Sequence, residues 1–122
     1  MRIIIIGSVA AGTSVAAKAR RNSEEAEIVL YEEDTDISYS VCGLPYYFGK
    51  MNISREQMVP RTPLWFEERY DLKIHTNHEV MEIDPVKKEI LIKNLNTHQI
   101  FKDAYDKLVL ATGAAPRLPK IP

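Results

Sequence analysis

The hydrophobic pattern at the start of the chain predicts a strand, a helix and a second strand, in that order. Ile3 to Ile6 form an unbroken apolar run that is too short to cross a membrane and apolar enough to be buried on both faces, as a central parallel strand is. A helical pattern follows through about Arg21, and a second apolar run, Ile28 to Tyr31, ends at Glu32. Because parallel strands need a crossover connection, usually a helix, this order predicts a parallel βαβ unit.

Two helix-start signals occur in the middle of the chain. Ser54 is a suitable N-cap for a short helix. Thr62 and Pro63 supply an N-cap and a first-turn proline for a second helix in the segment that follows. We expect Trp65 and Phe66 to pack this second helix onto the core.

Five further strands are predicted in the second half of the chain. Leu72 to His75 is a short alternating strand, and Glu79 to Asp84, Glu89 to Ile92 and Gln99 to Phe101 indicate an antiparallel meander. The last apolar run, Lys107 to Thr112, ends in small residues, as a buried parallel strand does when it stops beneath a ligand. We expect the parallel sheet to have the order third, second, first, fourth strand, with this last run beside the first strand.

Composition and charge restrict the range of functions. The chain has 122 residues, 45% hydrophobic positions and a net charge of −1, which fits one α/β core and gives no electrostatic case for a nucleic acid or an anionic membrane as partner. Its basic residues form no stripe with interleaved aromatic residues. Because a strand follows Met1 directly, we expect no targeting or transmembrane segment, and a cytoplasmic location.

The segment between the first strand and the first helix is rich in small residues. Gly7 and Gly12 occupy the first and last glycine positions of the pattern G-x-G-x-x-G, while Val9 replaces the middle glycine. A dinucleotide-binding fold needs such residues for a tight turn, for close approach to a pyrophosphate and for helix-to-strand packing. Glu32, at the end of the second strand, lies where such folds hold the hydroxyl pair of a ribose.

Cys42 is the only cysteine, so a disulfide within the chain is impossible. It is then a buried inert thiol, an intermolecular partner or a reactive thiolate. Gly43 permits a turn that a side chain would obstruct, and Pro45 suits the first turn of a short helix. We therefore expect Cys42 at a helix N-terminus, which stabilises a thiolate.

The histidines give no sign of a metal site. His75, His78 and His98 show no metal-ligand spacing with the cysteine or with a carboxylate. We expect them to be surface or strand residues.

Taken together, these segments resemble the pyridine nucleotide–disulfide oxidoreductases, and within them the single-cysteine branch of coenzyme A disulfide reductases, NADH oxidases and NADH peroxidases. The resemblance covers essentially the whole chain. The fold that it implies is a Rossmann-like, FAD-binding α/β fold of the three-layer ββα type, with a parallel sheet and an antiparallel three-stranded β-meander insertion. The segments that carry it, in the family's order and spacing, are Gly7 to Gly12 with Ala16, Arg20 and Arg21; Tyr31-Glu32; Cys42 to Tyr47; Arg61 to Pro63; His78 to Val80; and Tyr105 to Ala114 with Pro116.

The resemblance implies a flavoprotein that moves electrons from NAD(P)H through FAD to Cys42 as the catalytic residue. Its glycine loop would approach the FAD pyrophosphate, Glu32 the adenosine ribose and the backbone of Val80 the adenine. Val80 is equally well explained as an ordinary strand residue, whereas Thr112 ends so apolar a strand that a partner is expected. The implied FAD-binding residues are Gly7, Val9, Ala10, Ala11, Gly12, Glu32, Val80, Ala111, Thr112 and Gly113.

A single sulfur limits the chemistry that the resemblance implies. One cysteine cannot cycle an internal disulfide, so Cys42 would cycle through a mixed disulfide with a small thiol such as coenzyme A, or through a sulfenic acid as in the oxidases and peroxidases. The oxidases and peroxidases characteristically carry a histidine in the glycine loop, where this chain has Ala10, and this favours coenzyme A disulfide over oxygen or peroxide as substrate. Val41 departs from the asparagine that some coenzyme A reductases have at this position.

One face of the first helix is a candidate substrate site. Ser14, Lys18 and Arg21 are spaced four and three residues apart and so share a face. With Ser38 they resemble the family's coenzyme A contacts, and a hydroxyl with two cations suits phosphate groups. A solvated helix face whose last cations complement the helix dipole explains the same residues equally well.

Fold logic and the resemblance both indicate that residues 1–122 are the N-terminal portion of an FAD-binding domain. The family adds an NAD(P)H-binding domain and a dimerisation domain, which implies a homodimer, and its downstream flavin contacts are absent here, so we expect this stretch alone to retain little FAD. The fourth parallel strand would expose an open edge that invites pairing. The competing hypothesis is a non-catalytic nucleotide-binding module in which Cys42 is structural.

Overall fold

The computed structural model describes residues 1–121, and its centre is a four-stranded parallel sheet with the order β3-β2-β1-β7. The strands are β1 (Arg2–Ile6), β2 (Glu27–Tyr31), β3 (Lys73–His75) and β7 (Lys107–Leu110). In register, Ile4 of β1 lies beside Val29 of β2 and Leu108 of β7. The predicted strand order is confirmed, and β7 is an edge strand, as expected.

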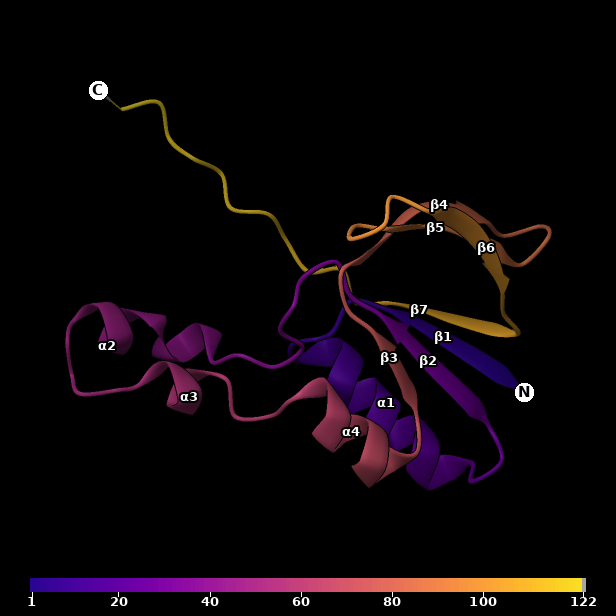
Figure 1. Cartoon of the computed structure of the whole chain (residues 1–122), viewed down its shortest axis with the longest axis horizontal. Helices are drawn as coiled ribbons and strands as arrows, with labels where there is room; N and C mark the ends of the chain where they lie inside the picture. Colours follow the sequence, from indigo (N-terminus) through magenta and orange to yellow (C-terminus); the bar gives the residue numbers. More distant parts are fainter. Residues whose placement is uncertain (122) are drawn as a thin grey trace.

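The two faces of this sheet are covered by different layers (Figure 1). The helices α1 (Ala11–Asn22) and α4 (Pro63–Tyr70) cover one face. The other face carries the predicted antiparallel meander, with strand order β4-β5-β6, built from β4 (His78–Asp84), β5 (Glu89–Asn94) and β6 (Ile100–Ala104).

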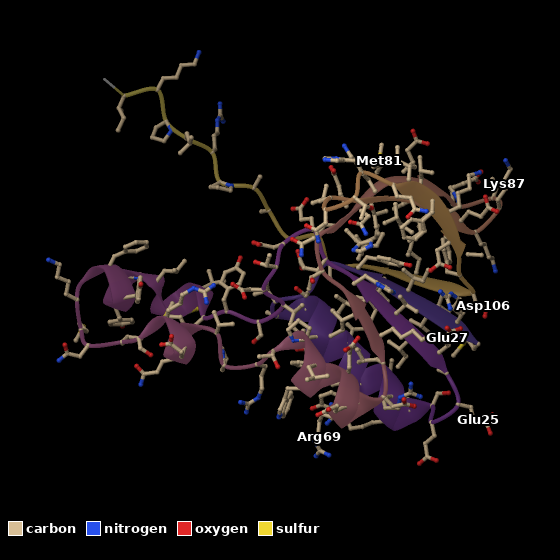
Figure 2. The ribbon with its side chains drawn as sticks, viewed as in Figure 1. Glu25, Glu27, Arg69, Met81, Lys87 and Asp106 are labelled. Atoms are coloured by element: carbon tan, nitrogen blue, oxygen red, sulfur yellow. The ribbon has the colours of Figure 1, made fainter. Side chains whose placement is uncertain are left out.

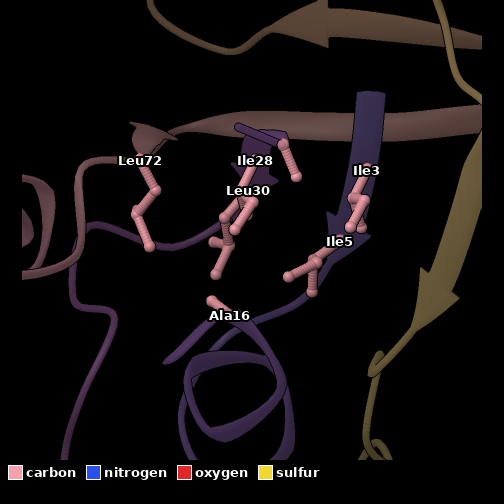
Figure 3. Packing of buried hydrophobic residues seen from close by; sticks show 7 residues of the cluster. Ile3, Ile5, Ala16, Ile28, Leu30 and Leu72 are labelled. Carbon is pink, nitrogen blue, oxygen red and sulfur yellow. The ribbon is translucent and has the colours of Figure 1, made fainter. Parts of the chain in front are cut away.

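The isoleucine run of β1 supplies both hydrophobic cores because successive strand residues point to opposite faces. Ile3 and Ile5 pack with Ala16 of α1 on the helix side (Figure 3). Ile4 and Ile6 pack with the meander, including Ile90 and Ile92 of β5. An unbroken apolar run was required here, since a strict alternation would leave one face polar.

Both predicted helix starts are confirmed by side-chain caps. The Thr62 hydroxyl accepts a hydrogen bond from the Trp65 amide at 3.2 Å, with Pro63 in the first turn of α4. Ser54 forms a reciprocal capping box with Gln57 at the start of α3 (Arg55–Met58). One detail was wrong: Trp65 does not pack α4 onto the core but remains 39% exposed.

Trp65 can remain exposed because other residues anchor α4 to the body. The Arg61 guanidinium lies over the Trp65 ring, 4.5 Å from its centroid. Tyr70 packs against the helix-side core instead, and its carbonyl accepts a hydrogen bond from Arg20 of α1 at 2.9 Å. The half-buried Phe66 lies beside Tyr70, with 5.4 Å between ring centroids.

A polar clamp joins the meander to the parallel sheet. Asp103 of β6 accepts hydrogen bonds from the Arg2 guanidinium at 2.7 Å and from the Tyr31 hydroxyl at 2.8 Å. The hydrogen bond to Glu27 is the main cause that raises the pKa of Arg2, and Asp103 adds to it. The Arg2 amide donates to Asp106 at 2.6 Å, and Figure 2 shows Glu27 and Asp106 at the same end of the sheet.

The segment around the cysteine projects from this body (Figure 1). This Cys42 arm, residues 39–59, contains a 3-10 turn at Val41–Gly43, the helix α2 (Leu44–Phe48) and the helix α3. Residues after Gly113 extend away from the sheet without strand or helix as far as residue 121. Among the described residues, the helices are too short or too polar to traverse a bilayer.

Candidate functional site

A cleft of about 820 Å³ opens at the carboxyl ends of β1, β2 and β7, where open α/β sheets bind ligands. Every predicted FAD-binding residue except Gly12 lines it: Gly7, Val9, Ala10, Ala11, Glu32, Val80, Ala111, Thr112 and Gly113. Residues far apart in the sequence are thus brought to one place by the strand order. The volume lies within the range of ligand sites in proteins.

Two glycines let the loop after β1 lie close to its neighbours. Gly7 has a φ of +91°, and a side chain there would overlap the carbonyl of Ala111 after β7. Gly12 lies inside α1, where a Cβ would overlap the carbonyl of Gly7. These contacts are the tight turn and the close helix-to-strand packing expected from the sequence. Val9, in place of the middle glycine, has a φ of +38°, so it carries backbone strain at the cleft.

The N-terminus of α1 lies at the cleft without a side-chain cap. Ala10 is the N-cap residue and makes no capping hydrogen bond, and the first turn contains no acidic residue. Thr13 of α1 stabilises the glycine loop, since its hydroxyl donates to the carbonyl of Val9 at 2.6 Å. Free amides at the positive end of a helix bind anions. This donor set therefore fits a pyrophosphate.

The glycine loop holds the carboxylate of Glu32 in the wall of the cleft. The carboxylate is buried and accepts hydrogen bonds from the amide of Ser8 at 2.9 Å and from the Ser8 hydroxyl. The amide of Asp34 donates to its other oxygen at 3.1 Å. Glu32 thus links the glycine loop to the end of β2, while the same side chain lines the cleft.

Several cleft residues were not among those predicted to bind FAD. Ser8 sits inside the quoted glycine loop, but nothing in the sequence marked its hydroxyl. His78 begins β4 and is a strand residue, as expected. It also lines the cleft, and its ring centroid lies 6.1 Å from that of Tyr31. The other residues in this group that line the cleft are Ile6, Tyr31, Glu33, Asp34, Asp36, Tyr39, Val41, Glu79, Leu110 and Ala114.

A small cluster of tyrosine and histidine rings lies at the cleft, which Tyr31 and His78 line. Tyr31 and His75 stack with 5.0 Å between centroids, and His75 and His78 lie 5.3 Å apart. Burial is the main cause that lowers the pKa of His75, and the nearby His78 lowers it further. Burial also raises the pKa of Tyr31, with Asp103 adding to the effect. Within residues 1–121 these histidines take part in no group of side chains suited to hold a metal ion.

Thr112 was expected to end the last strand, but β7 already ends at Leu110. Thr112 was expected to have a partner, but it is exposed and its hydroxyl makes no hydrogen bond among the described residues. Val80 is half-buried in β4 and packs against the meander-side core. Its contribution to the cleft is therefore compatible with packing alone as well as with a backbone contact.

Cys42 is exposed as a free thiol, and its position differs in detail from the prediction. It lies in the 3-10 turn that precedes α2, and the helix begins two residues later at Leu44. Gly43 has an ordinary φ of −83°, but a side chain there would meet the Ser40 hydroxyl oxygen at 2.7 Å. Gly43 is therefore required for space and not for an unusual backbone conformation.

The neighbours of Cys42 are also exposed. Val41 lines the cleft, whereas Cys42 itself does not. The sequence alone leaves two roles open for Tyr46 and Tyr47, which are to line the flavin side of the site or to fill the core. They are 55% and 40% exposed, which rules out the core.

The predicted substrate residues lie on α1 and on the segment that follows β2. Ser14, Lys18 and Arg21 are all exposed, as residues of one helix face are. The Ser14 hydroxyl donates to the carbonyl of Ala10 at 2.6 Å, whereas Lys18 and Arg21 form no ion pair within residues 1–121. Ser38 is half-buried and comes from the separate segment between β2 and the Cys42 arm.

Comparison with known proteins gives one consistent result. The pyridine nucleotide-disulphide oxidoreductase family matches residues 1–122. Coenzyme A disulfide reductase from Staphylococcus haemolyticus is 38% identical over 113 residues, which are 93% of this chain and 26% of that protein. The chain thus spans about a quarter of the length of the curated relatives that it matches.

Solved structures share the fold closely. The crystal structure of reduced CoADR-RHD from Bacillus anthracis is 42% identical with a TM-score of 0.94, and the match covers 99% of this chain and 22% of that one. The water-forming NADH oxidase from Lactobacillus brevis, bound to NADH, is 30% identical with a TM-score of 0.92, over 100% of this chain and 27% of that one. A NAD-dependent persulfide reductase from A. fulgidus is 33% identical with a TM-score of 0.91, and the match covers 99% of this chain and 22% of that one.

Proposed function

This chain belongs to the pyridine nucleotide-disulphide oxidoreductase family, and from that premise we propose that it is the N-terminal part of the FAD-binding domain of an enzyme that uses NAD(P)H to reduce coenzyme A disulfide at Cys42. The single observation that carries the proposal is the cleft. It gathers the glycine loop, Glu32 and the end of β7 at one edge of the sheet.

The residues of the cleft fit FAD by the chemistry of their donors and acceptors. The uncapped start of α1 at Ala10 and Ala11 suits the pyrophosphate. The carboxylate of Glu32 suits a ribose hydroxyl, and the backbone of Val80 suits the adenine. When bound, FAD supplies the transfer of an electron pair from NAD(P)H to a sulfur.

Cys42 supplies the nucleophile. Its thiolate attacks one sulfur of coenzyme A disulfide, the sulfur–sulfur bond breaks, and the first coenzyme A leaves as a thiolate that takes up a proton. The resulting mixed disulfide on Cys42 is then reduced by two electrons, which releases the second coenzyme A. In sum, NAD(P)H, one proton and the disulfide give NAD(P)⁺ and two coenzyme A thiols.

Three observations favour this substrate. The curated relatives include coenzyme A disulfide reductases, and the glycine loop has Ala10 where oxidases and peroxidases characteristically have a histidine. The exposed face of Ser14, Lys18 and Arg21 offers one hydroxyl and two cations to phosphates. Ser38 is the fourth residue proposed for this contact.

The second candidate is an NADH oxidase or peroxidase that cycles a sulfenic acid on Cys42. The likeness to the water-forming NADH oxidase favours it. A non-catalytic module with a structural Cys42 has less support, because a structural thiol is usually buried and Cys42 is exposed.

Mass spectrometry of the full-length protein, purified without reductant, separates these functions. The proposal predicts a coenzyme A adduct on Cys42 that dithiothreitol removes and that is absent from Cys42→Ser. An added oxygen at Cys42 would instead select the oxidase or peroxidase. An unmodified Cys42 that iodoacetamide alkylates no faster than free cysteine near neutral pH would support the structural thiol.

We further propose that the protein acts as a cytoplasmic homodimer, in which the NAD(P)H-binding and dimerisation domains follow residue 122. Light scattering on the full-length protein tests the dimer, and a monomeric mass would contradict it. The isolated chain is expected to retain little FAD. Stoichiometric yellow flavin on residues 1–122 would contradict that expectation.

A further inference from the structure

The hydroxyl of Ser8 is buried against a charged group that lines the cleft. Ser8 is 4% exposed and Glu32 is 8% exposed. Both the amide and the hydroxyl of Ser8 donate to the same carboxylate oxygen, Glu32 Oε2. A hydrogen bond to a buried charged group contributes more than one between neutral groups, so this contact strongly restricts the carboxylate.

Glu32 is fixed from the other side as well. Its Oε1 accepts from the Asp34 amide at 3.1 Å. Its own amide donates to the His75 carbonyl at 2.9 Å, and its carbonyl accepts from the His78 amide at 2.9 Å. Within residues 1–121, Glu32 takes part in no ion pair. The carboxylate is thus immobile and held by neutral donors alone.

The number of acceptor positions that remain on Glu32 follows from its chemistry. A carboxylate offers about four lone-pair positions, two on each oxygen. Ser8 occupies both positions on Oε2, and Asp34 occupies one on Oε1. One acceptor position therefore remains, and it belongs to Oε1.

We propose that Ser8 is a positioning residue that fixes Glu32 so that it accepts a hydrogen bond from one hydroxyl, and not from both, of the adenosine ribose of FAD. This inference rests on the proposed function, because FAD supplies the ribose. Ser8 makes no direct contact with the ligand in this account and acts only through Glu32. The hydroxyl pair expected from the sequence is thus replaced by a single hydroxyl.

A purely structural role for Ser8 would have a different signature. A role of Ser8 that does not pass through Glu32 would weaken FAD binding whether or not residue 32 is a carboxylate. A positioning residue that acts through Glu32 weakens binding only when the carboxylate is present. A double-mutant cycle between the two positions separates these roles.

The experiment measures FAD affinity of the full-length apoprotein by flavin fluorescence for the wild type, Ser8→Ala, Glu32→Gln and the double variant. Ser8→Ala keeps the amide donor and removes only the hydroxyl. We expect Ser8→Ala to raise the Kd about tenfold in the wild-type background and less than threefold in the Glu32→Gln background. Ser23→Ala, at the other end of α1, is the matched control and should leave the Kd unchanged.

A second measurement needs no variant. Competition of ADP, 2′-deoxy-ADP and 3′-deoxy-ADP with FAD for the wild-type apoprotein should show about tenfold weaker binding for one deoxy analogue and less than threefold for the other. Equal effects of the two analogues overturn the single-hydroxyl inference.

The outcomes separate this inference from the proposed function. A Ser8→Ala Kd less than threefold above the wild type, or an equal loss in both backgrounds, overturns the role of Ser8 while FAD binding stands. A wild-type apoprotein that binds no FAD overturns both.

Discussion

The cleft at the carboxyl ends of β1, β2 and β7 and the Cys42 arm differ in how completely the chain itself determines them. The cleft is built on two packed cores, and its acidic residue, Glu32, is buried and fixed by three hydrogen bonds. The arm holds the thiol on exposed turns, with Phe48 76% and Met51 63% exposed. The cofactor half of the proposed site is therefore preformed, whereas the thiol half lies on exposed residues.

The arm is attached to the body at few points. Met58 is its one buried residue among the described ones, and the hydrogen bond from the Ser40 amide to the Met58 carbonyl, at 2.8 Å, joins two parts of the arm and not the arm to the body. Arg55 forms an exposed ion pair with Asp36 at 3.0 Å, which contributes little to stability in water. Local opening of the arm should therefore cost much less free energy than unfolding of the body.

Alanine at a glycine in each region gives the largest expected contrast. Gly12→Ala places a Cβ against the rigid carbonyl of Gly7, and we expect it to lower the free energy of unfolding by about 3 kcal/mol or more. Gly43→Ala meets the Ser40 hydroxyl, which can rotate away, and should cost below about 1 kcal/mol. Urea unfolding of the purified chain, followed by circular dichroism, measures both. Equal losses would contradict the contrast.

Truncation of an apolar side chain sharpens the same contrast. Ile5 of β1 is fully buried between the parallel sheet and α1, so Ile5→Ala should lower the free energy of unfolding by about 2–5 kcal/mol. Phe48→Ala in the arm should change the free energy of unfolding by less than about 0.5 kcal/mol. A loss above about 2 kcal/mol for Phe48→Ala would show that the arm packs against the body in solution.

The two helix caps provide a smaller and closely matched test. Thr62→Ala removes the cap of α4 in the body, and we expect a loss of about 1 kcal/mol. Ser54→Ala removes the cap of α3 in the arm, where local opening precedes global unfolding, so its effect on global stability should be less than about half as large. The same urea titration measures both variants, and a reversed order would contradict the account.

The pH dependence of stability gives the smallest expected effect, and it lies in the body. Because the pKa of folded His75 is lowered below its ordinary 6.5, the unfolded chain binds a proton more readily than the folded chain. Stability should therefore be retained above about pH 6.5 and fall as the pH drops through the folded pKa. His75→Asn should reduce this loss, whereas His98→Asn, at an exposed position, should not. Free energies of unfolding at several pH values test this, and an unchanged slope in His75→Asn would contradict it.

The fold was largely predictable because its signals are local. The isoleucine run, the Thr62 cap and the alternating meander strands each indicate their structure within a few residues. Fold logic, together with the resemblance to the family, predicted the strand order. The glycine loop was predictable for the same reason, since Gly7 and Gly12 are required by close backbone contacts.

The remaining features depend on contacts between distant residues, which leave no local pattern. Trp65 looks like a core residue in sequence, but Arg61 covers it at the surface. His78 reaches the cleft only because β4 begins where β2 ends. The bond between Ser8 and Glu32 spans 24 positions in the chain. Each of these needed the three-dimensional arrangement.

The most direct test of the central claim is the turnover of coenzyme A disulfide by the full-length protein with Cys42→Ser, measured together with its FAD content. Because Cys42 is exposed and lies outside the preformed cleft, the account predicts wild-type FAD content and a rate at least about a thousandfold lower. A Cys42→Ser protein that binds FAD normally and reduces the disulfide within about threefold of the wild-type rate would contradict it.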